Sequence, residues 1–436
     1  MLTSATVSAT AFVGDGSGLT NIGTSSSTFK DSKSNITLGT SMPNLTDTSG
    51  LGMRNTAIGA NSLNSNTSGY YNTALGANSL RRNTTGYQNI AIGEDALEYN
   101  TTGYENIAIG EDALQNNTEG NKNVAIGDDS MEENTTGEYN TAVGDDALNK
   151  NTTGNYNVAL GKSALYSNTL GNWNVAVGSN ALKANDDGTE NTAIGNLAME
   201  ENLSGKKNIA VGEQSLNANE DGDENSALGS DALRYNTSGS YNVAVGRESL
   251  ESNTTGSNNS ALGIQSGLAV TSGSGNTFLG AYADASTGTL SNSTAIGYAA
   301  SVTTSNTIQL GNTDIELIRG QVAFTNASDR RLKENIKGTK YGLDEVLKLE
   351  PVDYVLKSNG LKQLGFIAQD VKPLIPEVVT GVEGNLEKGE TLGITYSSLI
   401  PVLTKAIQEQ QKTIEALKEK QEKLEVQIAL LLEKLN

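Results

Sequence analysis

The chain has 436 residues, enough for two or three domains, but 48 are Gly and only 5% are aromatic, which favours burial spread along a fibre over one large globule. The formal net charge is −20, and nearly all of it lies before residue 328, because residues 328–436 hold 16 Lys and Arg against 17 Asp and Glu; a front part that acidic repels nucleic acid and anionic membranes. The absence of Cys and His excludes disulfides, thiolate zinc sites and His-based triads.

Residues 1–54 begin with "MLTSATVSAT", which has neither a basic stretch nor a long apolar core. We therefore expect no secretion signal and, since no apolar run of 18 residues occurs anywhere, no membrane insertion. "AFVGDGSGLTNI" at 11–22 is an apolar stretch with a Gly-rich turn, and no Gly-Lys-Ser/Thr follows that would make it a phosphate loop. "NITLG" at 35–39 has the form of an isolated first coil. We interpret 1–54 as an attachment or capping segment.

From Asn55 to residue 305 the chain repeats every 17 residues, as "NIAIGEDALEYNTTGYE" at 89–105 illustrates. Fifteen units start in step, from Asn55 to Ser293. Position five is Gly in every unit, and in the first twelve units position nine is Leu or Met and position twelve is Asn. A constant period without insertions is typical of a solenoid. The fold class we predict is mainly β: a parallel β-solenoid shaft of 17-residue coils in a trimeric fibre, followed by a small α+β domain with a C-terminal coiled-coil helix.

Each unit predicts one coil. Its "Asn-x-Ala-aliphatic-Gly" start alternates like a short strand with both faces covered, the small face against a close neighbour. "EDALEYN" predicts a single helical turn capped by Asp95 or Asp112, or a second short strand. "NTTG" predicts a turn. Fifteen coils at about 4.8 Å each would form a rod of roughly 70 Å.

Three kinds of repeated side chain invite a functional interpretation. The Asn columns predict hydrogen-bonding ladders rather than glycan acceptors. Acidic pairs such as Glu94-Asp95 predict a solvated face rather than calcium ligands, so we expect no metal and no cofactor. The aromatic residues of the last two positions either cover a coil corner or form a stripe for stacking on sugar rings. They are Tyr70, Tyr71, Tyr87, Tyr104, Tyr139, Tyr156, Trp173 and Tyr241.

After residue 305 two further patterns appear. "NTIQLGNTDIELIRGQVAF" at 306–324 predicts two or three strands, so that 306–327 would form a β cap at the end of the solenoid. Residues 398–436 predict a helix whose apolar residues follow a 3-4 spacing, with Ile at a and Leu at d and with Gln410 and Gln421 on the same seam. Ile at a and Leu at d favour a two-stranded coiled coil, but the two Gln layers weaken this preference. The sequence therefore leaves the number of helices in the coiled coil open.

Three motifs occur in order in the last part of the chain: "SDRRLKENI" (328–336), "LGFIAQDVKPLIPEVV" (364–379) and "YSSLIPVLTKAIQE" (396–409). Together they resemble the self-cleaving intramolecular chaperone domain at the C-terminus of phage tail fibres and tailspikes, including endosialidases. The resemblance covers 328–436. The repeat region and "AFVGDGSGLTN" are similar, more loosely, to repeat regions of phage tail fibres and trimeric bacterial adhesin heads.

The resemblance implies a domain that drives trimerisation and then cuts itself off with a serine–lysine dyad. By position, the scissile bond joins Ala327 and Ser328, Ser328 is the nucleophile and Lys333 the base. Asp329, Arg331 and Asn335 are candidate supporting residues, although helix capping accounts equally well for Asp329 and Asn335. Independently of the resemblance, an activated nucleophile in a chain without His and Cys must be Ser or Thr, with a Lys or a carboxylate as its base. A five-residue spacing requires the segment to turn or extend for Ser328 and Lys333 to meet.

These observations favour a homotrimeric receptor-binding phage tail fibre, made in the host cytoplasm and located in the virion. We expect its shaft to bind a host surface receptor, with a glycan as the expected class, and its N-terminus to bind other tail or baseplate proteins. A polysaccharide-degrading tailspike would need a distinct pair of carboxylates, and the acidic residues here recur in columns. A surface adhesin would need a secretion signal or anchor. A Thr-rich ice-binding solenoid is a weaker alternative, since the same Thr residues serve the turns.

Overall fold

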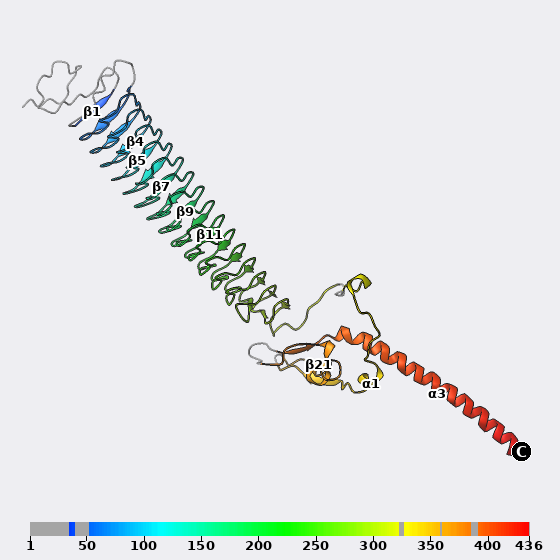
Figure 1. Ribbon diagram of the computed structural model, residues 1–436. Coiled ribbons are helices and arrows are strands. Elements are labelled where there is room, and N and C mark those ends of the chain that lie inside the picture. Colours follow the sequence, from blue (N-terminus) through cyan, green and yellow to red (C-terminus); the bar gives the residue numbers. More distant parts are fainter. Residues whose placement is uncertain (1–34, 40–51, 322–326, 358–359, 385–390, 436) are drawn as a thin grey trace, which may run out of the picture. The chain divides into compact units, whose positions relative to one another are not determined.

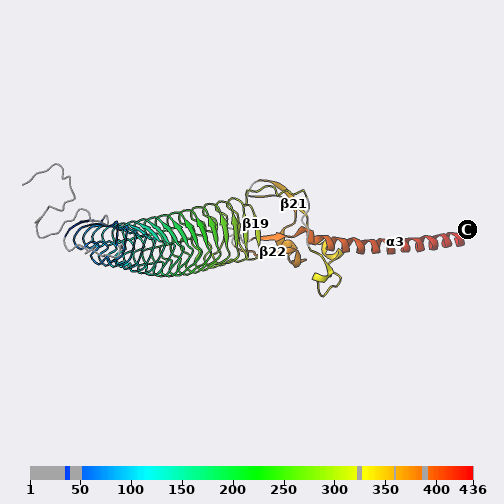
Figure 2. The same ribbon diagram turned by 90° about the horizontal axis from the view of Figure 1, so that it is seen from above.

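The computed structural model describes residues 35–39, 52–321, 327–357, 360–384 and 391–435. It divides the chain into two units, 1–310 and 311–436. The first is a stack of coils, visible from two directions in Figures 1 and 2, and the second is a small domain with a long helix. Most of the N-terminal segment 1–54, including its Gly-rich turn, lies outside the described residues.

One parallel sheet of 17 short strands runs along the first unit, and each strand pairs in register with the strand of the next coil. The sheet includes β1, so "NITLG" forms a coil as predicted and pairs with β2. The strands are β1 (Ile36–Leu38), β2 (Thr56–Ile58), β3 (Thr73–Leu75), β4 (Ile90–Ile92), β5 (Ile107–Ile109), β6 (Val124–Ile126), β7 (Thr141–Val143), β8 (Val158–Leu160), β9 (Val175–Val177), β10 (Thr192–Ile194), β11 (Ile209–Val211), β12 (Ser226–Leu228), β13 (Val243–Val245), β14 (Ser260–Leu262), β15 (Thr277–Leu279), β17 (Thr294–Ile296) and β19 (Ile308–Leu310). The predicted parallel solenoid of 17-residue coils is confirmed.

The core of the solenoid is thin and built from small side chains. The Ala at position three, such as Ala91 or Ala108, points inward and is fully buried, as is the Leu or Met at position nine, such as Leu97. The aliphatic side chain at position four points outward, because successive strand residues face opposite sides. In the single chain, therefore, only the small face of the strand is covered.

Two buried ladders of Asn side chains join the coils, as the sequence predicted. In the first, Asn89 Oδ1 accepts the backbone N–H of Asn106 (3.0 Å), one coil along. In the second, Asn100 Nδ2 donates to Asn83 Oδ1 (2.7 Å). Both columns also donate to the same carbonyl, that of Gly103, from Asn89 Nδ2 (2.8 Å) and Asn100 Nδ2 (3.0 Å). These bonds satisfy amides that would be costly to bury unpaired.

The invariant Gly at position five has a steric cause. Gly110 adopts a φ of 145°, and a Cβ there would lie 2.1 Å from the carbonyl oxygen of Gly127 in the next coil. No side chain fits between backbones that approach so closely. The spacing of the coils thus depends on this column.

The prediction of a helical turn after the strand is wrong. Asp95 and Leu97 both have a left-handed backbone (φ 56° and 53°), which a helical turn excludes. Their N–H groups bond to other coils instead, from Asp95 to Ala77 O in the preceding coil (3.0 Å) and from Leu97 to Ala113 O in the following one (3.0 Å). The Asp at position seven is therefore a residue that tolerates this conformation, rather than a helix cap.

The last coils depart from the repeat, with compensating changes. Phe278 stands at position three, where most coils have Ala, and Gly267 stands at position nine in place of Leu; a Cβ on Gly267 would lie 2.8 Å from the Phe278 ring. A second short parallel pair, β16 (Asp284–Ala285) and β18 (Ser301–Val302), forms here. Of the strands expected over 306–324, the described residues form one, β19, which continues the solenoid sheet on β17. Residues 322–326 lie outside the described part.

The second unit is α+β and small. Its elements are η1 (Arg330–Leu332), α1 (Leu343–Val346), β20 (Val352–Val355), β21 (Lys362–Gly365), α2 (Ala368–Val371), η2 (Pro376–Val378), β22 (Val379–Gly381), β23 (Leu392–Ile394), η4 (Tyr396–Ser398) and α3 (Leu399–Leu435). Two antiparallel pairs form, β20 with β21 and β22 with β23. The base of α3 packs into the domain, and Glu409 accepts the backbone N–H of Leu343 at the start of α1 (2.9 Å).

The predicted C-terminal helix is confirmed as α3, 37 residues long. Only its first turns are covered, through Leu399, Val402 and Ala406. The apolar seam beyond them is exposed in the single chain. Its exposed members are Leu403, Ile407, Ile414, Leu417, Leu424, Ile428, Leu431 and Leu435.

Candidate functional site

The segment 327–335 brings the two residues of the implied dyad together. A three-residue helical turn, η1, separates Ser328 from Lys333, and Lys333 itself has an extended backbone (φ −125°, ψ 139°). This combination of turn and extension lets the Lys333 ammonium reach back, so that Nζ donates to Ser328 Oγ at 2.6 Å. The two groups thus lie within hydrogen-bond distance, as the implied Ser–Lys dyad would require.

Asp329 and Arg331 form a pair of their own beside the dyad. Asp329 caps η1 by accepting the backbone N–H of Arg331 (2.8 Å), and its carboxylate also accepts from Arg331 Nη2 (2.7 Å). The Arg331 side chain lowers the pKa of Asp329, with the backbone bond adding to the effect. Asp329 therefore has the capping role, and it offsets the charge of Arg331 close to Lys333. Asn335 has a left-handed backbone (φ 53°) and turns the chain just after the dyad.

Ser328 and Lys333 are both exposed to solvent in the single chain. Every residue from 327 to 340 is exposed, including Leu332 and Ile336, whose exposed fractions are 72% and 58%. Two large apolar side chains on either side of Lys333 are thus left in water. A lysine acts as a base only when it is neutral, which requires burial or nearby positive charge, and the single chain supplies no burial.

The two downstream motifs build the core of the domain that carries this segment. "LGFIAQDVKPLIPEVV" contributes Val371, Ile375 and Val378, and "YSSLIPVLTKAIQE" contributes Leu399 and Val402. The Tyr396 hydroxyl accepts the backbone N–H of Phe366 (3.0 Å), which joins the two motifs directly. The second and third motifs therefore contribute packing residues, whereas the first motif, 328–336, is exposed.

The aromatic residues of the shaft form two separate columns. At position 16, Tyr87 lies between Tyr70 and Tyr104, with ring centroids 4.9 and 4.8 Å apart and nearly parallel planes. At position 17, Tyr156 lies between Tyr139 and Trp173, at 4.9 and 5.8 Å. Tyr71 contacts Tyr70 edge-on, and Tyr241 is exposed farther along the position-17 column. Because the central rings have both faces covered by their neighbours, a sugar can reach only their edges or the ends of a stack.

The acidic residues at positions six and seven form a ridge of like charges. The pKa of Asp112 is raised to about 6, chiefly by burial and then by the charges of its neighbours Asp95 and Asp129. Burial is also the main reason why the pKa of Asp129 is raised. Among the described residues, no group of three or more Asp, Glu, Cys or His side chains is placed to hold a metal ion. The described helices also include none with the length and apolarity needed to cross a membrane.

One column with functional meaning escaped the sequence analysis. Position four is Ile, Leu or Val in all fifteen units, yet none of these side chains is buried in the single chain, and Leu262 is 51% exposed. Position two beside it carries no charge in any unit. The sequence pattern that could have revealed this surface is the lack of charge at positions two and four in every unit. The side chains at position four form an apolar strip along the outer face of the sheet.

Comparison with known proteins supports the interpretation of the second unit. Residues 328–380 match a family model described as "chaperone of endosialidase". The match begins at Ser328, and it includes the first two of the three motifs. No curated protein matches the chain. The findings support a fibre-like protein whose C-terminal part contains an intramolecular chaperone domain of a self-cleaving peptidase family.

Proposed function

We propose that the chain is a structural, receptor-binding tail fibre of a phage, active as a homotrimer and located in the virion. Its C-terminal domain promotes assembly and then removes itself by cutting between Ala327 and Ser328. The observation that carries the proposal is the 2.6 Å contact between Lys333 Nζ and Ser328 Oγ. The described residues around this contact, 327–340, are all exposed.

The chemistry needs only water besides the chain. Neutral Lys333 accepts the Ser328 hydroxyl proton as Oγ attacks the carbonyl carbon of Ala327. The C–N bond breaks, the proton passes to the departing α-amine of Ser328, and an ester joins Ala327 to Oγ. Hydrolysis of this ester yields the carboxylate of Ala327 and restores the Ser328 hydroxyl. Because each domain cuts only its own bond, the reaction has a single turnover.

Assembly would control this reaction through burial. The exposed Leu332 and Ile336 flank Lys333, and packing them against other copies would remove the ammonium from water. That favours the neutral amine that acts as base. Unassembled chains would keep Lys333 solvated and inactive, so cleavage would follow correct folding.

Two apolar surfaces support association between copies. The uncharged strip at positions two and four runs along the sheet of the shaft, and the exposed a/d seam runs along α3. Exposed apolar surfaces this extensive are unusual in a monomer. The seam has the 3-4 spacing of a coiled coil, which fits a bundle of α3 helices. The edges and open ends of the two aromatic columns are the proposed receptor contacts on the shaft.

The intact mass of the purified protein tests the cleavage. Wild type is expected to split into 1–327 and 328–436, whereas Ser328→Ala and Lys333→Met are expected to stay at 45.5 kDa, at least about 10³-fold slower to cut. Lys337→Met removes another exposed lysine of the same segment and should cut like wild type. Cleavage of Ser328→Ala at the same bond would refute the dyad. If the wild-type protein is a folded trimer but stays intact, the domain is a chaperone that does not cleave the chain.

A further inference from the structure

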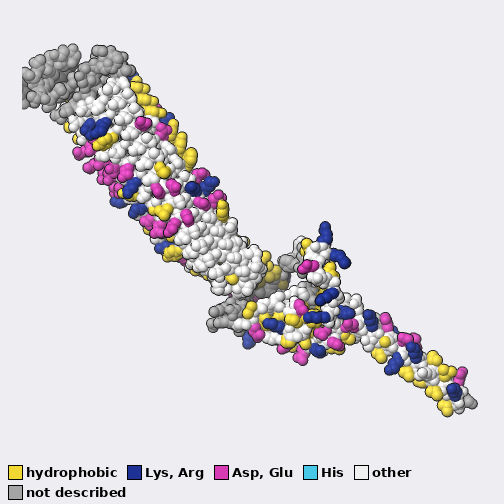
Figure 3. Space-filling view, viewed as in Figure 1, with side chains coloured by type: hydrophobic (Ala, Val, Ile, Leu, Met, Phe, Trp, Pro, Cys, Tyr) yellow, Lys and Arg dark blue, Asp and Glu magenta, His cyan; other side chains and the backbone are white. Residues whose placement is uncertain are grey.

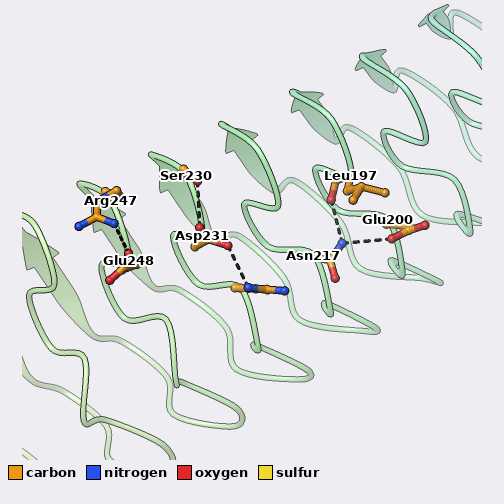
Figure 4. A network of polar contacts seen from close by, with 8 residues as sticks. Leu197, Glu200, Asn217, Ser230, Asp231, Arg247 and Glu248 are labelled. Carbon is orange, nitrogen blue, oxygen red and sulfur yellow. Dashed lines mark hydrogen bonds and ion pairs between the residues drawn. The ribbon is translucent and has the colours of Figure 1, made fainter.

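The corner formed by positions six and seven changes its chemistry along the shaft. In the four coils that start at Asn89, Asn106, Asn123 and Asn140, both positions are acidic. Charged side chains are costly to bury unless paired, so this corner faces solvent in any assembly. Figure 4 shows the last charged residues of this corner: Asp231 accepts a hydrogen bond from the Ser230 hydroxyl, and Glu248 pairs with Arg247.

In the last three coils the same corner loses its charge and gains tyrosines. The pairs at positions six and seven are Ile264-Gln265, Ala281-Tyr282 and Tyr298-Ala299. Residues 252–313 contain a single charged side chain, that of Asp284. Its carboxylate is mostly buried and accepts the backbone N–H groups of Ala285 (2.8 Å) and Ala269 (3.1 Å). The face of this end of the rod seen in Figure 3 is accordingly almost free of coloured charges.

Tyr282 and Tyr298 meet in a different way from the stacked tyrosines of the shaft. Their ring centroids are 5.7 Å apart with planes at 82°, so the edge of one ring meets the other and neither has both faces covered by its partner. Tyr298 is 66% exposed, more than any other described aromatic side chain, and Tyr282 is 44% exposed. The pair therefore presents free ring faces to solvent.

We propose that this tyrosine corner, at the C-terminal end of the solenoid, binds a neutral saccharide of the host surface. The inference rests on the proposed function as a receptor-binding fibre, and it names the receptor class and a site for it. A sugar ring has an apolar face of C–H groups that packs on an aromatic face, while hydroxyls such as those of the tyrosines bond its rim. An anionic glycan is disfavoured, because the strongly acidic shaft beside the corner repels negative charge.

Binding to immobilised oligosaccharides tests the proposal. The full chain, as wild type and as Ser328→Ala, is applied to neutral hexose and N-acetylhexosamine oligosaccharides and, in parallel, to sialylated and sulfated ones. We expect binding to at least one neutral saccharide, weakened at least about tenfold by Tyr298→Ala and by Tyr282→Ala. Tyr298→Phe keeps the ring and should retain most of the binding. Tyr235→Ala, which removes an exposed tyrosine of the shaft outside both aromatic columns, should bind like wild type.

Three outcomes would overturn the site: no binding to any neutral saccharide, binding to anionic glycans alone, or neutral binding that Tyr282→Ala and Tyr298→Ala leave unchanged. In the last case, loss of binding in the double variant Tyr156→Ala, Trp173→Ala would place the contact on the aromatic column of the shaft. Oligomeric state and intact mass are measured on the same samples. If the protein is a trimer that cleaves itself normally but binds no neutral saccharide, only the proposed saccharide site is contradicted. If the protein binds saccharide but remains an uncleaved monomer, only the proposed function is contradicted.

Discussion

The shaft and the C-terminal domain solve the problem of burial in opposite ways. In the shaft each coil covers the next, so a core one or two side chains thick, such as Ala91 and Leu97, is complete within one chain. Among its described residues, the C-terminal domain has a core cluster of five buried apolar side chains, and it leaves Leu347, Leu364 and most of the α3 seam in water. The difference teaches that the shaft can fold coil by coil, whereas the domain leaves apolar surface that the proposed assembly would cover. In that proposal, the part of the chain without a complete core is the part that joins the copies.

The most disruptive change should be one in the glycine column of the shaft. In Gly110→Ala the new Cβ would lie 2.1 Å from the Gly127 carbonyl oxygen, in a left-handed conformation that only Gly adopts freely. We expect a loss of more than about 4 kcal/mol of stability, seen by circular dichroism as a lower melting temperature of the shaft. Gly338→Ala in the C-terminal unit is the matched control, because no atom lies within 4 Å of its added Cβ. Equal melting of the two variants would contradict the close packing of the coils.

A charge on the α3 seam should break assembly without unfolding the shaft. Leu417→Asp places a carboxylate at a d position, where each copy of a bundle would bury it. We expect association at least tenfold weaker by sedimentation velocity, together with slower cleavage between Ala327 and Ser328. Ala416→Asp adds the same charge next to the seam, and should associate and cut like wild type. If Leu417→Asp remains fully trimeric, α3 does not hold the copies together.

The smallest effect concerns the acidic ridge of the shaft. The pKa of Asp112 is raised to about 6 from its ordinary 3.8, so the folded state holds this proton more tightly than the unfolded state does. Its contribution to stability is therefore greatest below about pH 4 and is lost as the pH rises to about 6. Asp112→Asn should raise the melting temperature at pH 7 by a degree or two and flatten its dependence between pH 4 and 6. A lower melting temperature at pH 7 would show that the carboxylate stabilises the coil instead.

The sequence alone predicted the 17-residue period and the Asn ladders, because identical or similar residues recur at fixed positions. It also predicted α3, because apolar residues follow a 3-4 spacing along the helix. It was misleading at "EDALEYN", where an Asp before Ala-Leu has the form of a helix start. The left-handed backbone of Leu97 could not be foreseen, since Leu rarely adopts it, and here its bonds to neighbouring coils stabilise it. At the candidate site, the spacing of Ser328 and Lys333 showed that the chain must turn. The contact itself, and the exposure of Leu332 and Ile336, needed the structure.

The in-register stacking of the coils makes the reach of the shaft adjustable. Each strand meets an equivalent strand above and below, and each Asn ladder continues one rung at a time. One additional 17-residue unit would therefore lengthen the rod by about 4.8 Å and meet surfaces already complementary to it. Removing a unit would bring equally compatible surfaces together. A deletion of another length inside the repeat would shift the columns of the coil that carries it, and that coil would have to be rebuilt. The terminal steps from β1 to β2 and from β17 to β19 are built in this way, since they differ in length from the repeat and still keep the register of the sheet. Whole units are therefore the change of length that disturbs the shaft least.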